Sequence, residues 1–287
     1  MTTQNRLRRH AATGLRRLAQ SVGQDLVTHD YYSPIPAWED LPDDVFMRRS
    51  PLTAISYDED AYVQFLQRLE PYLAEFEPPN GFVWDNGMYE RIEADVLYAI
   101  VRAARPKRII ELGSGYSTLI IADAIRQNGV DGSPCTYSVF DPFARNFVRA
   151  RATELGWRNE SAADVALEVF RELGEDDILF VDTTHTVKLG SEVNYIILDI
   201  LPALAPGVLV HIHDIFLPYE YPRGFFEQKC YWAEQYLLQG FLTNNQSWEI
   251  ALPLAALTKD RPADVARLVP SFRGDAGPGA FWIRCVG

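Results

Sequence analysis

Short hydrophobic runs alternate with longer amphipathic stretches from residue 108 onward. Four runs have the length and composition of buried β-strands, and they lie at Arg108–Leu112, Thr136–Phe140, Ile178–Val181 and Val208–His213. The intervening segments repeat apolar residues at helical spacing, at 117–128, 143–155, 166–173 and 191–201. Strands that alternate with helices are typical of βαβ units, so the pattern predicts an α/β fold with a mainly parallel sheet.

Weaker patterns predict the rest of this region. We expect a short third strand near Asn159–Ala163, a helix near Phe225–Leu242, and two closing strands at Trp248–Leu254 and Phe281–Val286. Residues 261–278 would form an insertion between the closing strands. The aromatic loop 215–222 could cover a bound ligand or simply pack on the surface.

The N-terminal third has a different pattern. Residues 21–60 are rich in Pro, Asp and Tyr without clean periodicity, and helical spacing then extends from Asp58 to Phe76. A second helix, Tyr89–Ala104, ends before Pro106. We therefore predict an N-terminal arm and helical extension over residues 1–85, and one domain over residues 86–287.

The first 20 residues carry basic side chains and no acidic one, the arginines being Arg6, Arg8, Arg9, Arg16 and Arg17. We interpret this segment as a solvated helix or one that contacts a second copy in a homo-oligomer. A transit peptide or a surface-binding helix is the alternative, but no apolar segment follows.

Charge and composition restrict the partners. The chain has 287 residues and a net charge of -12, which argues against binding nucleic acid through its phosphates. Its 3 cysteines show no CxxC spacing, so neither a zinc cluster nor a disulfide framework is predicted, and a cytoplasmic location fits. No apolar run reaches the length of about 20 residues that a membrane span needs. A small-molecule substrate is the expected partner.

A glycine turn follows the first predicted strand. The strand passes through Glu111 and enters a helix by way of Gly113, Ser114 and Gly115, where the backbone can approach a ligand closely. Glu111 suits a positively charged ligand, such as a sulfonium or an ammonium group. Thr118 stands where a dinucleotide site would have its third glycine, which disfavours NAD. The alternative is that the glycines only shape the turn.

Acidic residues follow the next two strands. Asp141 ends the second strand and could accept both ribose hydroxyls, or could cap the following helix. Asp164 follows the third strand and could bind an adenine amino group, or could be an ordinary solvated or capping residue.

Histidines and aspartates gather after strands four and five. Asp182 and His185 follow strand four, while His213 and Asp214 end strand five, and ligands bind at such carboxyl ends. Asp182, His213 and Asp214 form a set suited to a divalent ion, Mg²⁺ or a heavier metal, and His185 is the predicted general base. The alternative is a metal-free hydrogen-bond network that orients the loops. His211, by strand alternation, is predicted to be a hydrogen-bonded core residue.

The sequence Glu111-Leu-Gly-Ser-Gly115, Asp141 and the later strand ends resemble the class I S-adenosylmethionine-dependent methyltransferases. The resemblance covers residues 90–287. It implies a Rossmann-like, seven-stranded sheet of order 3-2-1-4-5-7-6 and S-adenosylmethionine as cofactor. We assign to the cofactor Glu111, Gly113, Ser114, Gly115, Asp141, Asp164 and Asp182.

The segment from Asp182 to Asp214 also resembles the metal-dependent sugar O-methyltransferases of macrolide biosynthesis. In those relatives an aspartate after strand four and an acidic pair after strand five hold Mg²⁺. A histidine three residues beyond the first aspartate, at the position of His185, is the base. Here His213 replaces the first acid of the pair.

Together these features predict an S-adenosylmethionine-dependent O-methyltransferase of a small hydroxylated acceptor, such as a sugar or a natural product, with catalytic residues His185 and Asp182. Methyl transfer to nitrogen or carbon is one alternative. The other is a noncatalytic protein of the methyltransferase fold that binds a ligand or drives assembly.

Overall fold

The computed structural model describes residues 13–26, 31–274 and 279–287. By its internal contacts the chain separates into two units, Met1–Val45 and Phe46–Gly287. In the first unit, residues 13–21 are helical and Trp38–Asp40 form a 3-10 turn. The predicted basic residues Arg6, Arg8 and Arg9 lie outside the described residues.

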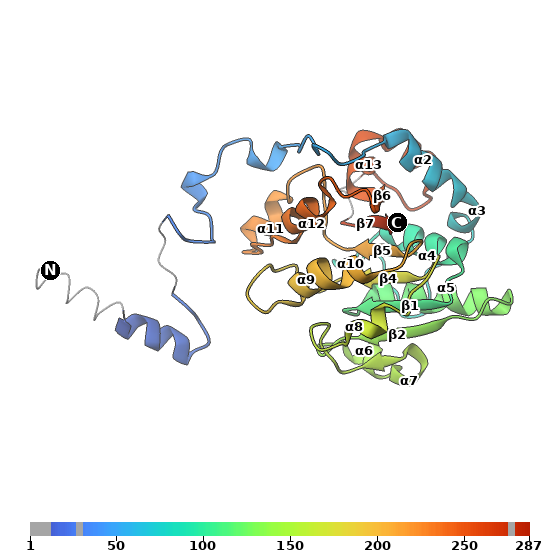
Figure 1. Ribbon diagram of the computed structural model, residues 1–287, viewed down its shortest axis with the longest axis horizontal. Coiled ribbons are helices and arrows are strands. Elements are labelled where there is room, and N and C mark those ends of the chain that lie inside the picture. Colours follow the sequence, from blue (N-terminus) through green and yellow to red (C-terminus); the bar gives the residue numbers. More distant parts are fainter. Residues whose placement is uncertain (1–12, 27–30, 275–278) are drawn as a thin grey trace, which may run out of the picture. The chain divides into compact units, whose positions relative to one another are not determined.

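The second unit is built on a seven-stranded sheet of order β3-β2-β1-β4-β5-β7-β6 (Figure 1). Its strands are β1 Arg108–Leu112, β2 Thr136–Phe140, β3 Trp157–Arg158, β4 Ile178–Val181, β5 Leu209–Ile212, β6 Trp248–Pro253 and β7 Phe281–Cys285. The first five are parallel, whereas β7 runs antiparallel to both β5 and β6. The predicted fold class and strand order are confirmed.

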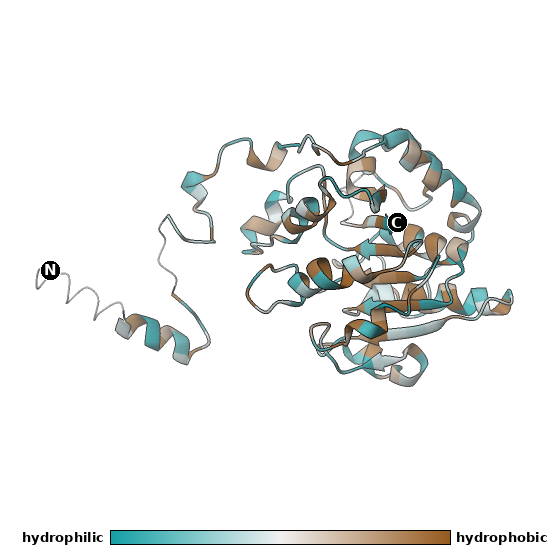
Figure 2. Cartoon of the chain, viewed as in Figure 1, coloured by the Kyte–Doolittle hydropathy of each residue, from teal (hydrophilic) through white to brown (hydrophobic). Residues whose placement is uncertain are grey.

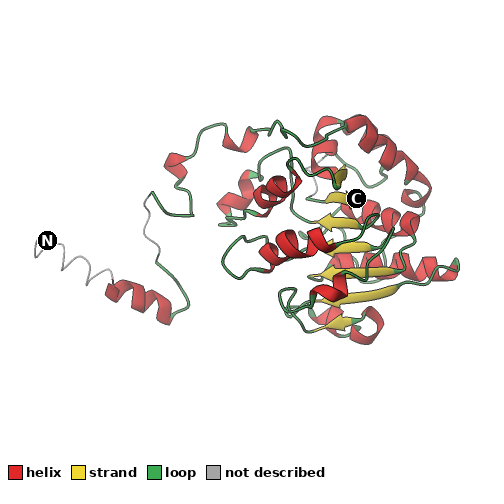
Figure 3. Cartoon of the chain, in the orientation of Figure 1, coloured by secondary structure: helices red, strands yellow, loops and turns green. Residues whose placement is uncertain are grey.

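Helices lie on both faces of the sheet (Figure 3). They are α2 Glu59–Arg68, α3 Glu70–Leu73, α4 Glu93–Ala104, α5 Tyr116–Val130, α6 Asn146–Arg149, α7 Ala152–Leu155, α8 Leu167–Phe170, α9 Glu192–Tyr195, the π-helical turn η3 Ile196–Ile200, α10 Leu201–Ala203, α11 Arg223–Glu227, α12 Glu234–Leu242, α13 Leu254–Asp260 and α14 Pro262–Leu268. No helix in the described part of the chain combines the length and the apolar character that crossing a membrane requires.

The central strands form the core. Every residue of β4 and β5 is buried, and these strands are strongly hydrophobic (Figure 2). A parallel strand covered by helices on both faces needs apolar side chains on both, so it produces a continuous apolar run in the sequence. The apolar run at Ile178–Val181 therefore predicted the bounds of β4 correctly.

The third strand differs from its predicted position. It is Trp157–Arg158 and not Asn159–Ala163, because the chain joins the sheet immediately after Gly156. Gly156 ends α7 with a φ of 60°, and a Cβ there would lie 2.2 Å from the Tyr137 carbonyl oxygen. The approach of two backbones thus sets where this strand begins.

Several predicted helices also differ. The helix predicted at 143–155 is divided into α6 and α7, and the one at 225–242 into α11 and α12. The predicted insertion after residue 261 begins with α14. Helices α2 and α3 belong to the same compact unit as the sheet, packing on β6 and α4, whereas the predicted domain division falls at residue 85.

Gly113 occupies the tightest turn of the sheet. Its φ is 83°, and a Cβ at this position would lie 1.7 Å from the carbonyl oxygen of Asp182. Its amide donates to the carbonyl of Phe140 at 2.9 Å, so the turn after β1 is held between the ends of β2 and β4. Only glycine fits a position that combines positive φ with such a close backbone.

We predict that Gly113→Ala lowers the free energy of unfolding by at least about 2 kcal/mol, because the methyl group requires both strain and displacement of β4. Gly129→Ala in α5 is the matched control, since the methyl group added there would meet no neighbouring heavy atom within 4 Å. That change should stabilise by about 0.5–1 kcal/mol. Urea unfolding of both variants measures the difference, and equal effects would contradict the packing described.

Candidate active site

The turns after β1 and β2 bring two predicted cofactor residues together. The Ser114 hydroxyl donates to Asp141 Oδ2, and Asp141 Oδ1 accepts from the Phe143 amide at 2.7 Å. Asp141 therefore holds the turn that follows β2. The alternative expected it to cap a helix, but α6 begins only at Asn146 and has no side-chain cap. Asp141 also lies beside the glycine turn, where the ribose role predicted for it would require it.

Glu111 is fully enclosed instead of facing a ligand. Its carboxylate oxygens accept hydrogen bonds from the Ser117 hydroxyl, at 2.8 Å, and from the Tyr137 hydroxyl. Burial raises the pKa of Glu111 to about 8, although these hydrogen bonds oppose the shift. Glu111 thus ties β1 to α5 and β2, and it has no exposed surface for direct contact with a cofactor.

Asp164 is exposed in a turn after β3, where its amide donates to the Ser161 carbonyl at 2.9 Å. Gly115 starts α5 and has no heavy atom within 4 Å of a Cβ position, so the space beside it is open. The cofactor roles of these two residues stay predictions.

The ends of β4 and β5 place two carboxylates and two imidazoles around one point. His185 Nε2 lies 3.4 Å from Asp182 Oδ1 and 3.5 Å from Asp214 Oδ2. His213 Nδ1 lies 3.6 Å from each of the same two oxygen atoms. The structure therefore brings together every residue predicted for catalysis and for metal binding, and we call these four residues the edge cluster.

The edge cluster is open on its carboxylate side. The side chains of His185 and His213 are 6% and 7% exposed, whereas those of Asp214 and Asp182 are 15% and 32% exposed. A molecule reaching the cluster therefore meets Asp182 first.

Two buried glutamates, which the sequence patterns did not single out, hold the far side of each imidazole. Glu234 Oε2, from the start of α12, lies 2.9 Å from His185 Nδ1. Glu93 Oε1, from the first turn of α4, lies 3.1 Å from His213 Nε2. The only sign of them in the sequence is an acidic residue at the start of an apolar helix, which the capping of an exposed helix explains equally well.

The backbone around these side chains is strained. Ile92, His185 and Asp214 have positive φ values of 72°, 56° and 54°. Such conformations cost free energy in residues other than glycine, most of all in a β-branched residue, and they gather at functional sites. Gly279 leaves room for the Asp214 turn, since a Cβ there would lie 2.7 Å from Asp214 Oδ1.

The charged groups in and around the edge cluster together shift the pKa values of its histidines and of Asp182 more than burial does. Although burial opposes protonation, the carboxylates of Asp182 and Glu234 raise the pKa of His185 to about 10. The pKa of His213 is also raised, against burial, by Asp182, Glu93 and Asp214. The pKa of Asp182 is held well below its usual range by the imidazoles despite burial. Four carboxylates still outnumber two imidazoles, so the site carries excess negative charge even when both rings are protonated.

His211 lies outside the edge cluster. Its ring is fully buried and stacks on Phe180, with ring centroids 4.1 Å apart. Burial lowers its pKa well below the usual value, so the ring is neutral. The expected core position is correct, but neither ring nitrogen has a hydrogen-bond partner among the described residues.

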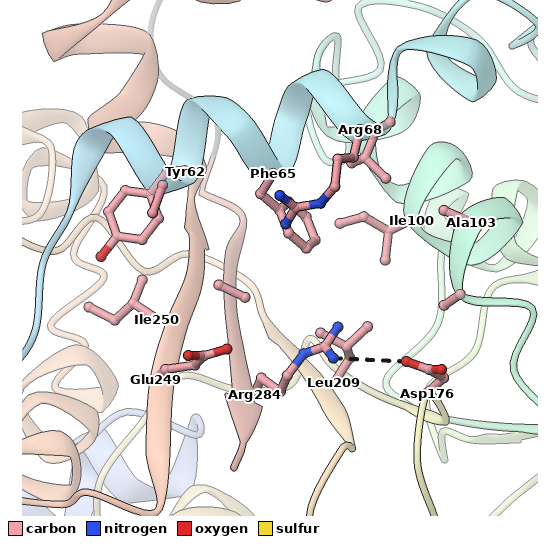
Figure 4. Close-up of a pocket in the computed structure, with 14 residues that line it drawn as sticks. Tyr62, Phe65, Arg68, Ile100, Ala103, Asp176, Leu209, Glu249, Ile250 and Arg284 are labelled. Atoms are coloured by element: carbon pink, nitrogen blue, oxygen red, sulfur yellow. Dashed lines mark ion pairs between the residues drawn. The ribbon is translucent and has the colours of Figure 1, made fainter.

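A cavity of about 530 Å³ lies away from these residues (Figure 4). It is lined by α2, the end of α4 and the strand ends that carry Leu209, Glu249 and Arg284, with Arg284 3.9 Å from Asp176. Leu209 begins β5, so the cavity opens at the amino ends of the parallel strands. Ligands of open α/β sheets bind at the opposite, carboxyl edge, so the edge cluster is the candidate active site.

Comparison with known proteins identifies the domain. The sequence model of a family described as a methyltransferase domain matches residues 110–215, which run from β1 to the residue after Asp214. Residues 110–215 therefore match a methyltransferase domain, and the sheet that carries them has the strand order that the resemblance implies. The family match and the strand order together confirm the predicted family and the prediction of a methyltransferase enzyme.

The relatives of this methyltransferase are distant. An uncharacterized protein of Archaeoglobus fulgidus is 25% identical over an alignment of 177 residues that covers 55% of this chain and 78% of that protein. The SAH-bound Podospora anserina methyltransferase PaMTH1 shares 18% identity, with a TM-score of 0.45 over 79% of this chain and 88% of that one. A Bacillus cereus O-methyltransferase in complex with SAH shares 15%, with a TM-score of 0.38 over 81% and 93%.

We predict that Glu111 makes stability depend on pH. Its pKa is about 8 in the folded chain against 4.5 for the ordinary group, so the folded state binds the extra proton between these values. The resulting stabilisation is complete below pH 4.5 and is lost as pH rises to 8, at up to about 1.4 kcal/mol per pH unit.

Glu111→Gln keeps the shape and cannot ionise, so its stability relative to the natural chain should rise steadily from pH 5 to pH 8. Urea unfolding at several pH values measures this difference, in which the other titrating groups largely cancel. Parallel stability curves for the two proteins would show that Glu111 ionises normally.

Proposed function

We propose that this methyltransferase moves the methyl group of S-adenosylmethionine to a hydroxyl oxygen of a small acceptor, such as a sugar or a natural product. The observation that supports this proposal is the direct contact between the glycine turn after β1 and the Asp182 backbone after β4. The turn expected to bind the donor therefore adjoins the cluster expected to bind the acceptor.

On the donor side, Gly113, Ser114 and Gly115 would present backbone to the cofactor, while Asp141 would accept the ribose hydroxyls. The open space beside Gly115 supports this role. Asp164 would reach the adenine amino group. Glu111 would not touch the cofactor. It would hold the glycine turn in place, and its charge would attract the positive charge of the cofactor.

On the acceptor side, Asp182 and His185 would activate the hydroxyl. An oxygen–carbon bond forms as the sulfur–carbon bond of the sulfonium breaks and S-adenosylhomocysteine leaves. The hydroxyl proton would pass to the predicted base His185, which can accept it when its inner ring nitrogen is unprotonated. Methyl transfer from a sulfonium depends mainly on alignment of the two reactants. The rigid placement of Asp182 beside the glycine turn would provide that alignment.

A divalent cation at Asp182, His213 and Asp214 is part of this proposal. Among the described residues, no group of three or more His, Cys, Asp or Glu side chains meets the criteria of a preformed metal site. Two observations nevertheless favour a cation. One is the excess negative charge, and the other is the buried His213 Nδ1, which faces two carboxylates but has no hydrogen-bond partner in the described part of the chain. A bound cation would lower the pKa of the acceptor hydroxyl.

The remaining predictions are a cytoplasmic location, assembly through the N-terminal arm and no nucleic-acid partner. They are retained as part of the proposal.

Two variants test which residues bind the methyl donor and which activate the acceptor. Asp141→Asn should weaken S-adenosylhomocysteine binding at least about 10-fold, because it removes one charged hydrogen-bond acceptor worth about 1.5–3 kcal/mol. His185→Gln should leave that affinity nearly unchanged and lower methyl transfer about 100-fold or more. Calorimetry measures binding, and labelled S-adenosylmethionine with a panel of hydroxylated acceptors measures transfer.

Glu249→Gln, at the opposite edge of the sheet, is the control for loss of a carboxylate and should change neither quantity. Absence of S-adenosylhomocysteine binding to the natural chain would refute the donor assignment. Binding without transfer to any hydroxyl, amine or carbon acceptor would favour a noncatalytic role.

A further inference from the structure

The two inner ring nitrogens of the edge cluster are each placed between the same two oxygen atoms. The four separations between ring nitrogen and carboxylate oxygen are 3.4, 3.5, 3.6 and 3.6 Å. Nitrogen and oxygen ligands about 2.0–2.2 Å from a tetrahedral metal ion lie about 3.3–3.6 Å from one another. These four nitrogen–oxygen distances therefore lie in the range expected between ligands of one ion.

A hydrogen-bonded network would look different. A charged N–H group lies about 2.7–2.9 Å from the oxygen to which it donates, and it points at one acceptor. The outer nitrogens behave in this way, at 2.9 Å from Glu234 and 3.1 Å from Glu93. The inner nitrogens do not, because each is nearly equidistant from Asp182 and Asp214 and too far for such a bond.

The outer glutamates determine the state of both rings. When a carboxylate accepts the N–H of one ring nitrogen, a metal ion would bind at the other nitrogen in place of the proton that the ring carries there. Glu234 would orient His185 in this way, and Glu93 would orient His213. Both glutamates are buried, at 0% and 3% exposure, so each pairing is enforced by packing.

We infer that His185 is a fourth ligand of the proposed cation, beside Asp182, His213 and Asp214, and that Glu93 and Glu234 are positioning residues for the two imidazoles. Two imidazoles and two carboxylates select a first-row transition ion such as Zn²⁺, Fe²⁺ or Co²⁺, whereas Mg²⁺ prefers oxygen ligands and water. The inference rests on the cation in the proposed function. It replaces the predicted role of His185 as a base by activation through the ion.

The exposed side of the cluster is consistent with this assignment. The imidazoles are covered, while Asp182 is the most exposed of the four ligands. An acceptor hydroxyl would approach from the Asp182 side, next to the glycine turn. The two imidazole ligands and the approach path therefore lie on different sides of the site.

The test uses the full chain stripped of metal and loaded with Co²⁺, Zn²⁺ or Mg²⁺. We expect one equivalent of Zn²⁺ or Co²⁺ per chain to be retained in the presence of a large excess of Mg²⁺. The Co²⁺ form should show the intense visible absorption of a four-coordinate ion. A weak six-coordinate spectrum, or no retention of Co²⁺ and Zn²⁺, overturns the inference whatever the variants do.

Variants then identify the ligands. His185→Gln should lower the Zn²⁺ affinity at least 10-fold and change the Co²⁺ spectrum, and Glu93→Gln and Glu234→Gln should each lower the affinity about 10–100-fold. His211→Phe, which keeps a stacked ring on the same strand, is the matched control and should leave both unchanged. An unaltered spectrum in folded His185→Gln would refute the fourth ligand.

The same samples separate this inference from the proposed function. Methyl transfer by a chain that holds none of these ions would overturn the inference and leave the function standing. Retention of the ion without S-adenosylhomocysteine binding would refute the function and leave the ion site standing.

Discussion

The meeting of two buried imidazoles with four carboxylates, two of them buried, at one edge of the sheet is the constraint on which the rest of this structure depends. A buried carboxylate is costly unless a partner of opposite charge or a hydrogen bond meets it. The partners here come from four places in the chain, the ends of β4 and β5 and the starts of α4 and α12. Their side chains can meet only if both helices begin at this edge, so the charges help to fix how the helices are placed.

The backbone strain has the same origin. His185 and Asp214 adopt positive φ in the turns that follow β4 and β5. In this conformation His185 Nε2 lies near Asp182, and Asp214 Oδ2 lies near both imidazoles. Strict alternation along β5 would have put His213 and Asp214 on opposite faces. The strand instead ends at Ile212, and the left-handed turn at Asp214 brings both side chains to one point. Strain of this kind persists because the surrounding sheet leaves no alternative path.

The sequence predicted the strands whose position depends only on the burial of their own side chains. The bounds of β1, β2 and β4 match their apolar runs, because burial on both faces leaves a continuous signal. It failed for β3, a two-residue edge strand whose position depends on the approach of Gly156 to the Tyr137 backbone. Periodicity within one segment carries no information about such a contact.

The same distinction applies to the site. Asp182, His185, His213 and Asp214 could be predicted because parallel strands end at a common edge. Glu93 and Glu234 could not, because helical periodicity tells which face of a helix is buried but not which neighbour its first turn will meet. Their importance follows only from the distance of each to an imidazole nitrogen.

Glu111 differs from its prediction in its contacts but can still interact with a positively charged cofactor. The prediction placed this acid against a positively charged cofactor, whereas the structure encloses it between Ser117 and Tyr137. A carboxyl whose pKa burial raises to about 8 is mostly neutral at pH 7. A sulfonium or ammonium bound at the adjoining turn would favour its ionised form, because an opposite charge lowers the pKa of a carboxyl. Glu111 and the bound sulfonium or ammonium group would then attract each other without direct contact. A glutamine at position 111 could preserve the packing but not this attraction.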